Sequence, residues 1–423
     1  MKNSRNLLSM LSIKDETLKI VEEGEKKCRQ FLTKIDDVVL YNQAKVLTAF
    51  QQNKIGQRHM TLSTGYGYDD IGRDGLEQLY ACVFKTEDAL VRPQIVSGTH
   101  AIALCLYGIL RPGDELLSIT GRPYDTLEET IGIRDSEGNG SLKELGVSYN
   151  EIDINHMETL NKSSFEKYIT EKTKMIFIQR SKGYQWRPSL SIENMKKIIN
   201  ILKDINKDLI ILIDNCYGEF TQTTEPTEIG ADIIAGSLIK NPGGGLCPTG
   251  GYIAGPSDLI ERITYRYSSP GIGREVGSYA ASYLPFFQGL FMAPHVVGQA
   301  IKSAILFSTV FKDLGYEVNP QPEEERCDII QSIKFPTAKQ LISFCQGIQK
   351  GSPIDSFVQP EPWEMPGYDH KVIMAAGTFI QGASIELSAD APVKPPYIAY
   401  VQGGLTYEHA KIGLATALQA IQD

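Results

Sequence analysis

Lys240 is placed where a side-chain amine could bond covalently to an aldehyde. It follows the apolar run 232–235 and precedes a glycine-rich turn that ends at Gly245. The amine must be neutral to attack an aldehyde, and partial burial lowers the pKa of a lysine because it penalises the charged form. The glycines would let the backbone pass close to a flat ligand. The pattern predicts a lysine that holds an aldehyde cofactor as an imine, but a surface lysine after a strand fits it too.

Asp214 ends the strongly apolar run 209–213, and open α/β sheets bind their ligands beyond the ends of such strands. A carboxylate there can hold a proton on a heteroaromatic nitrogen. Pyridoxal phosphate needs this contact, because a protonated pyridine withdraws electrons from a substrate carbanion. The same aspartate could cap a helix or bind magnesium. No second ligand or phosphate loop supports a metal, so no metal site is expected.

Ser97, Gly98 and Thr99 lie where a predicted strand at 94–97 gives way to a helix predicted from Thr99. The free N–H groups and the positive end of a helix attract an anion. This turn is therefore a candidate phosphate site, although Ser-Gly-Thr is also a common helix cap.

Two further side chains could complete the same site. Ser237, three residues before Lys240, could add a hydroxyl to the phosphate. Tyr124 follows another predicted strand and could stack on the cofactor ring, although most tyrosines in such loops only pack.

The elements that must position these side chains are strands alternating with helices. Residues 7–52 have a helical pattern, and a glycine-rich loop follows at 63–73. Apolar runs then alternate with amphipathic helices, which predicts an α/β domain with a mostly parallel sheet covered on both faces. The further predicted strands are 115–119, 175–178, 209–213, 232–235 and 251–254.

The character of the chain changes after an apolar helix at 296–311. The next strand-like runs predict a smaller α+β domain, and the predicted division is an N-terminal helical segment at 1–55, a large domain at 56–284 and a small domain at 285–423. The strands predicted for the small domain are 315–318, 328–334, 371–374 and 384–387.

The composition excludes several classes of protein. Lys and Arg number 42 against 51 Asp and Glu, and the net charge of −9 opposes binding to nucleic acid and to anionic membranes. The seven cysteines are scattered and form no CxxC pair, which is typical of a reducing cytoplasm. The predicted N-terminal helix contains charges, whereas a signal peptide has an uninterrupted apolar core. Polar residues within 284–311 favour a buried helix over a membrane span.

Taken in order, these features resemble a known family. The chain is similar to fold-type I pyridoxal-phosphate enzymes of the cystathionine lyase and methionine γ-lyase group, and most similar to the methionine γ-lyase-like family known as aluminium resistance proteins. Segments 236–245 and 377–388 carry the most specific part of the resemblance, which covers nearly the whole chain.

The resemblance implies a role for each matching residue. Lys240 is the imine lysine, Asp214 the partner of the pyridinium nitrogen, and Tyr124 the stacking residue. Tyr124 or Tyr66 is available for proton transfer. The implied phosphate ligands are Ser97, Gly98, Thr99 and Ser237, joined by Tyr66 or Tyr68 and Arg73 from a neighbouring subunit. A homodimer or a homotetramer of dimers follows. Alternatively, Tyr68 and Arg73 only hold the N-terminal segment against its own subunit.

Two departures from the group concern binding. Glu386 stands where the group has an arginine for the substrate carboxylate, and Arg180 and Lys394 are possible replacements or plain surface charges. Ile239 replaces a phosphate-binding hydroxyl residue.

The function implied is a pyridoxal-phosphate-dependent carbon–sulfur lyase of the cystathionine β-lyase or methionine γ-lyase type, acting on a small sulfur-containing amino acid. An aminotransferase or aldolase would use the same lysine and aspartate. A non-catalytic stress or metal-resistance protein that kept the fold is the other alternative.

Overall fold

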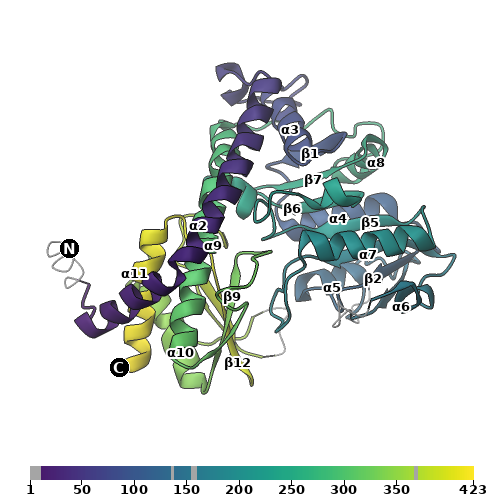
Figure 1. Ribbon diagram of the computed structural model, residues 1–423. Coiled ribbons are helices and arrows are strands. Elements are labelled where there is room, and N and C mark those ends of the chain that lie inside the picture. Colours follow the sequence, from purple (N-terminus) through teal and green to yellow (C-terminus); the bar gives the residue numbers. More distant parts are fainter. Residues whose placement is uncertain (1–10, 135–137, 154–159, 366–369) are drawn as a thin grey trace.

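The chain forms two sheets linked by long helices, as the computed structural model in Figure 1 shows. It describes residues 11–134, 138–153, 160–365 and 370–423. The larger sheet has seven strands, in the order β1 (Asp88–Arg92), β7 (Gly251–Gly255), β6 (Ile233–Ser237), β5 (Ile210–Asp214), β4 (Thr173–Gln179), β2 (Glu115–Ser118) and β3 (Ser148–Glu151).

The larger sheet is mostly parallel. Strands β6, β5, β4, β2 and β3 are parallel to one another, and β7 is antiparallel to both β6 and β1. Strand β1 therefore points the same way as β6. The carboxyl ends of β1, β2, β4, β5 and β6 meet at one edge of the sheet, which is where such sheets bind ligands.

Helices cover both faces of this sheet, since alternate strand residues point to opposite sides. One face buries its apolar side chains against α4 (Gly98–Ile109), α5 (Asp125–Ile131) and α8 (Ser257–Tyr267). The other packs against α3 (Ile71–Val83), α7 (Ile192–Ile205) and α9 (Leu284–Asp313). The short helix α6 (Lys162–Glu166) precedes β4. The predicted α/β class is confirmed.

The smaller sheet is antiparallel throughout, as predicted for an α+β domain. Helices α10 (Ala338–Lys350) and α11 (Tyr407–Gln422) pack against each other, and α10 also lies on the sheet. The five strands have the order β10 (Val372–Ala375), β11 (Ser388–Pro392), β12 (Tyr397–Gln402), β9 (Ile330–Phe335) and β8 (Glu317–Asn319).

The N-terminal helix α2 (Asp15–Gln52) crosses α9 and reaches the last helix of the chain (Figure 1). The Thr17 hydroxyl donates to Gln419 Oε1 at 3.2 Å, which ties α2 to α11. The predicted start of this helix near Leu7 lies outside the described residues. The domain boundaries after residues 55 and 284 stay predictions, although α9 does begin at Leu284.

Two predicted strands are wrong. Residues 94–97 are not a strand, because the chain turns there with Ile95 N–H bonded back to Arg92 O at 3.2 Å. The strand is β1, which starts six residues before the predicted one. Residues 384–387 are buried but not a strand, and β11 follows them instead. The sequence of β11, Ser-Ala-Asp-Ala-Pro, lacks the branched side chains that mark a strand, so only its pairing with β10 and β12 identifies it.

Helix α9 is long and apolar enough to cross a membrane by length and composition, with a mean hydropathy of 1.4 in its most apolar window. Of that window, 72% is buried within the protein. Its position between α2 and both sheets is that of a core helix, as the sequence predicts.

Candidate functional site

The strand ends described above surround one cavity of about 520 Å³. Residues from each of β1, β2, β4, β5 and β6, or from the turns that follow these strands, line it. The lining includes seven of the predicted site residues, namely Ser97, Gly98, Thr99, Tyr124, Asp214, Ser237 and Lys240, and also Lys394 from the small domain. Residues far apart in the chain thus converge as predicted.

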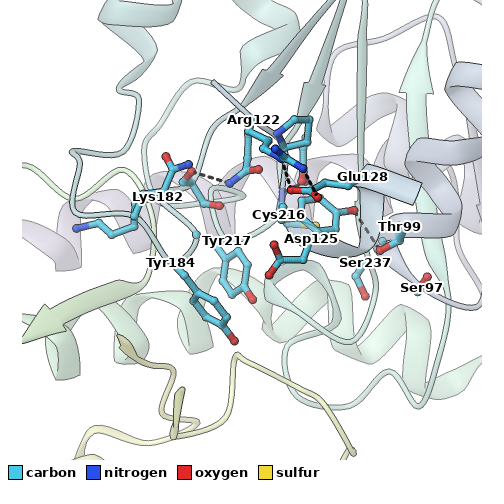
Figure 2. A pocket seen from close by; sticks show the side chains of 18 of the residues that line it. Ser97, Thr99, Arg122, Asp125, Glu128, Lys182, Tyr184, Cys216, Tyr217 and Ser237 are labelled. Carbon is cyan, nitrogen blue, oxygen red and sulfur yellow. Dashed lines mark hydrogen bonds and ion pairs between the residues drawn. The ribbon is translucent and has the colours of Figure 1, made fainter. Parts of the chain in front are cut away.

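One side of the cavity has the features of an anion site. The Ser97 hydroxyl caps α4 by accepting from His100 N–H at 3.0 Å, and the first N–H groups of a helix have no partner within the helix. A Cβ atom at Gly98 would lie 3.2 Å from Cys216 Sγ and 3.5 Å from Ser237 Cβ, so this turn and Ser237 are close neighbours. Figure 2 shows Ser97, Thr99 and Ser237 grouped together. A phosphate fits this cradle.

Tyr124 joins the anion side to the middle of the cavity. Its hydroxyl donates to Thr99 Oγ1 at 3.1 Å. Burial, followed by the negative charge of Asp214, raises the pKa of Tyr124, so the phenol stays protonated. The ring is therefore held beside the predicted phosphate turn as a neutral proton donor.

Asp214 lies at the carboxyl end of β5, with 5% of its surface exposed. Its Oδ1 accepts from Cys216 N–H at 3.1 Å. Burial raises the pKa of this carboxyl, while the nearby Lys240 acts in the opposite direction. A positively charged ring nitrogen placed here would add to that opposing effect and favour the carboxylate.

Lys240 projects into the cavity from the turn after β6, but its pKa differs from the prediction. Burial acts to lower the pKa, and Cys216, Tyr217 and Asp214 together raise it well above the ordinary value. The predicted lowering by burial is wrong for the protein without cofactor, because the surrounding acidic groups outweigh desolvation. The Nζ atom lies 4.1 Å from the centre of the Tyr217 ring.

The glycine-rich turn after Lys240 packs against the protein and not against the cavity. A Cβ atom at Gly243 would lie 1.8 Å from Leu238 O, and one at Gly244 would lie 2.4 Å from Gly289 O in α9. Neither glycine lines the cavity. The glycines therefore permit close packing of the turn on α9, which corrects the prediction that they make room for a flat ligand.

The three residues predicted to act across a subunit interface do not line this cavity. Tyr66 and Tyr68 are 70% and 64% exposed, and their rings lie 5.5 Å apart. Arg73 is buried instead, and its guanidinium donates to Gly67 O at 2.8 Å. For Arg73 this arrangement favours the alternative that it holds the N-terminal loop in its own subunit.

Of the two candidate carboxylate ligands, only Lys394 reaches the cavity. Arg180 is fully buried and does not line it. Its guanidinium donates to Asn215 Oδ1 at 2.8 Å and lies 3.7 Å from a carboxylate oxygen of Glu225. These partners use the charge of Arg180 inside the large domain, so its predicted role in substrate binding lacks support.

Glu386 has a structural role that its position in the motif did not reveal. Its carboxylate accepts from Phe379 N–H at 2.8 Å and Ile380 N–H at 2.9 Å, and 3% of its surface is exposed. Glu386 therefore closes the loop that carries the second specific segment. Ile239 lines the cavity and offers no hydroxyl, as predicted.

Other residues of the cavity were not singled out in the sequence. Lys182 is buried after β4, and its Nζ donates to Asn319 O in the small domain at 2.8 Å. Arg122 pairs with Glu128 at the rim (Figure 2). Both follow strand ends, so the strand-end rule that selected Asp214 could also have selected them.

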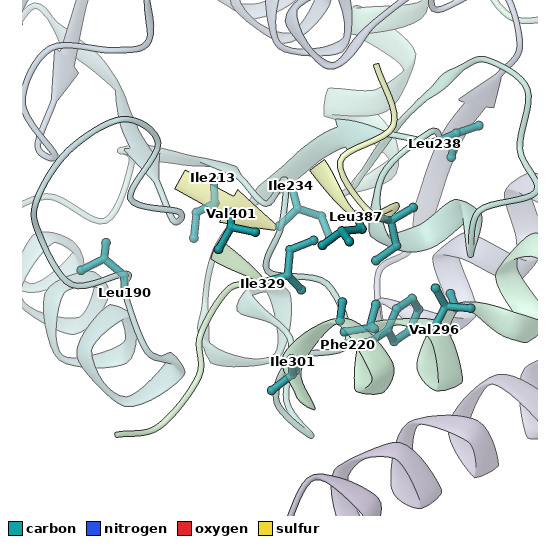
Figure 3. Close-up of a cluster of buried hydrophobic side chains, with 14 of the residues drawn as sticks. Leu190, Ile213, Phe220, Ile234, Leu238, Val296, Ile301, Ile329, Leu387 and Val401 are labelled. Carbon is teal, nitrogen blue, oxygen red and sulfur yellow. The ribbon is translucent and has the colours of Figure 1, made fainter. Parts of the chain in front are cut away.

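An apolar core behind the cavity joins the two domains. Figure 3 shows Ile213 and Ile234 of the larger sheet near Leu387 and Val401 of the small domain, and all four are buried in one cluster. Because interiors are close-packed, this shared core holds the small domain against the strand ends. It thereby fixes Lys394 relative to Lys240.

The fold and the site together define a class of protein. The cradle at α4 fits a phosphate, the cavity has room for a ring, and a carboxyl and an amine extend from neighbouring strand ends. These are the features of a fold-type I enzyme that carries pyridoxal phosphate on a lysine.

The chain belongs to the methionine gamma-lyase family, whose model matches residues 17–422. The uncharacterized protein YnbB of Bacillus subtilis (strain 168) is 53% identical over 387 residues, which are 92% of each chain. A solved structure from Clostridium novyi NT, described as a carbon-sulfur lyase involved in aluminum resistance, is 52% identical with a TM-score of 0.95 and covers 99% of both chains. L-methionine gamma-lyase of Pseudomonas deceptionensis is 27% identical over 203 residues, 47% of this chain and 45% of that protein.

The family assignment confirms the predicted resemblance and fold class, with pyridoxal 5'-phosphate as the cofactor. It also supports the description of the chain as a member of a lyase family. The cytoplasmic location, the absence of nucleic-acid and membrane partners, and the homodimer or homotetramer stay predictions.

Proposed function

We propose that this protein is a pyridoxal-phosphate-dependent carbon–sulfur lyase that cleaves a small sulfur-containing amino acid. The observation that carries the proposal is the convergence of Lys240, Asp214 and the start of α4 on one cavity. When bound, the cofactor supplies a protonated ring that accepts the electron pair released at the substrate α-carbon. In this proposal Lys240 Nζ holds the cofactor, Asp214 faces its ring nitrogen, and Ser97, Gly98, Thr99 and Ser237 bind its phosphate.

The protein's own groups then move the protons. With its amine free, Lys240 would serve as the base that removes the substrate α-proton, since it lines the same cavity. Tyr124 keeps its proton because burial raises its pKa, so it can protonate the departing sulfur. Expulsion of a thiol from the β or γ carbon, followed by hydrolysis, yields a thiol, a 2-oxo acid and ammonia. Both methionine γ-lyase and cystathionine β-lyase type reactions fit this scheme.

The test is product analysis with L-methionine and L-cystathionine. We expect thiol, 2-oxo acid and ammonia in equal amounts, because one elimination releases all three. The Lys240→Ala variant serves as the control for non-enzymatic breakdown. Transfer of the amino group to an added 2-oxo acid without ammonia would indicate an aminotransferase. Absence of turnover by the cofactor-loaded protein would favour the non-catalytic alternative.

We infer that Lys394 binds the carboxylate of the substrate. It is an exposed lysine at the cavity, and among the residues that the structure describes its amine has no ion-pair partner. Arg180 lies outside the cavity lining, and its charge is paired with Glu225. An unpaired cation beside the predicted cofactor site is the group that an amino acid carboxylate would contact.

The two candidates can be separated by measuring stability and kinetics on the same variants. We expect Lys394→Ala to raise KM about 10-fold with little change in Tm, because the lysine is exposed. Arg180→Met should instead lower the free energy of unfolding by about 3 kcal/mol, since it removes one of the two cations, Arg180 and Lys45, that pair with the buried Glu225 among the described residues. Thermal unfolding and steady-state kinetics provide the readouts. A KM effect confined to Arg180→Met would reverse the assignment.

The remaining part of the proposal concerns a second copy of the chain. The exposed rings of Tyr66 and Tyr68 are available to a neighbouring subunit, in keeping with the implied cofactor site at an interface. The guanidinium of Arg73 is hydrogen-bonded to Gly67 O in its own subunit. In this proposal, one of these tyrosines, and not Arg73, reaches the phosphate of the partner subunit.

A further inference from the structure

Tyr217 occupies a position next to Lys240 that its place in the sequence does not reveal. It follows β5 by three residues and lines the cavity. Lys240 Nζ lies over its ring, 4.1 Å from the ring centre. A cation within about 6 Å of an aromatic ring centre is attracted to the negative face of the ring.

The backbone of Tyr217 is in a conformation that is unfavourable for tyrosine. Its φ angle is +72°, in the left-handed region that bulky side chains rarely adopt. The surrounding loop holds it there, with Asn215 N–H bonded to Ala235 O at 3.0 Å and Gly218 N–H bonded to Asn215 O at 2.9 Å. Strain of this kind is unfavourable and is found mostly at functional sites.

The small domain fixes the orientation of the ring. Tyr217 packs against a cluster of Ile330, Ile398 and Tyr400, together with Tyr184. Figure 2 shows the rings of Tyr217 and Tyr184 on the same side of the cavity. A ring held from behind by another domain cannot turn away when the lysine changes its charge or bonding.

We propose that Tyr217 is a catalytic residue whose ring face binds the cationic nitrogen of Lys240 and keeps it aimed into the cavity. The inference rests on the proposed function, in which Lys240 holds the cofactor and afterwards accepts the α-proton as a free amine. Nζ gains one proton and one positive charge in that second step, and the ring face stabilises this charge without exchanging a proton itself. Tyr217 stays neutral, because burial raises its pKa.

Other groups also act on the charge of Lys240 and must be kept constant. Cys216, Asp214 and Tyr124 raise its pKa from the large domain, and Glu219 and Asp390, the latter in β11 of the small domain, also interact with it. The test therefore alters only the ring at position 217. Phe and Leu face the same backbone conformation as Tyr, so Tyr217→Phe is a matched control for Tyr217→Leu.

The readout is the pH titration of visible absorbance in the cofactor-loaded protein without substrate, which reports the charge on the linking nitrogen. We expect Tyr217→Leu to lower the pKa of the linking nitrogen by about one unit, which is the shift that the loss of a partly desolvated cation–π contact would produce. Tyr217→Phe should keep that pKa within a few tenths of a unit of the wild-type value, because it keeps the ring. Equal pKa values for Leu and wild type would overturn the proposal.

Two additions keep the test decisive. If Tyr217→Leu does not fold, pentafluorophenylalanine at position 217 preserves the shape and removes the negative ring face, with the same shift expected. If the wild type forms no absorbing linkage, the proposed function fails. In that case the role of Tyr217 is tested on the cofactor-free protein. The pKa of Lys240 is measured from the pH dependence of its acylation, which mass spectrometry follows. An unchanged pKa in Tyr217→Leu would contradict the inference.

Discussion

Replacing Lys240 with alanine is expected to remove the visible absorbance of the cofactor-loaded protein and to lower turnover by about 10³-fold or more. Both effects have one cause, since the same Nζ is proposed to hold the cofactor and to remove the α-proton. Reduction with borohydride before digestion should add the mass of the reduced cofactor to the peptide that contains Lys240. Mass spectrometry of that peptide and absorbance spectra of the two proteins are the measurements.

The chain offers a matched control for this experiment. Lys394 lines the same cavity, yet Lys394→Ala should keep the absorbance because its amine is proposed to meet only the substrate. Lys182 is a less suitable control, since its Nζ is bonded to Asn319 O and its loss would leave polar groups unpaired. A Lys240→Ala protein that still became covalently labelled after reduction would show that another lysine carries the cofactor.

Replacing Asp214 with asparagine is expected to reduce turnover about 100-fold while the protein remains folded. The buried carboxylate is proposed to hold a proton on the cofactor ring, and a neutral amide of nearly the same shape cannot stabilise that positive charge. A loss of about 2–3 kcal/mol corresponds to this factor. The variant should also bind the cofactor more weakly, which equilibrium dialysis measures.

Two companion variants separate charge from binding. Asp214→Glu keeps the negative charge and should recover part of the turnover. Ser237→Ala removes only a proposed phosphate contact, so it should weaken cofactor binding without lowering turnover at saturating cofactor. If Asp214→Asn turned over at the wild-type rate when saturated with cofactor, the proposed ring contact would be excluded.

The pH dependence of these effects has a defined sign. Without cofactor, burial raises the pKa of Asp214, so its carboxyl binds a proton at a higher pH than an ordinary aspartate does. A cationic ring nitrogen favours the ionised form and lowers that pKa. Cofactor binding should therefore weaken as the pH falls through the pKa that Asp214 has in the cofactor-free protein. Asp214→Asn should not show this weakening.

The sequence by itself determined which residues could perform the chemistry. A lysine and an aspartate at the ends of apolar strands, and a Ser-Gly-Thr turn at a helix start, converge on one cavity because parallel strands end at the same edge. Local sequence patterns are enough to predict these residues, because a strand and the residue that ends it are adjacent in the chain. The same reasoning predicted two sheets, but it misplaced one strand in each of them.

Only the tertiary structure decided what surrounds those residues. Tyr217 meets Lys240 because a loop and a second domain hold its ring in place, and the charge of Arg180 is used by Glu225 out of reach of the cavity. Acidic neighbours from several elements also reversed the expected direction of the Lys240 pKa shift. Electrostatic effects and packing depend on distances between segments far apart in the sequence, and those distances exist only once the chain has folded.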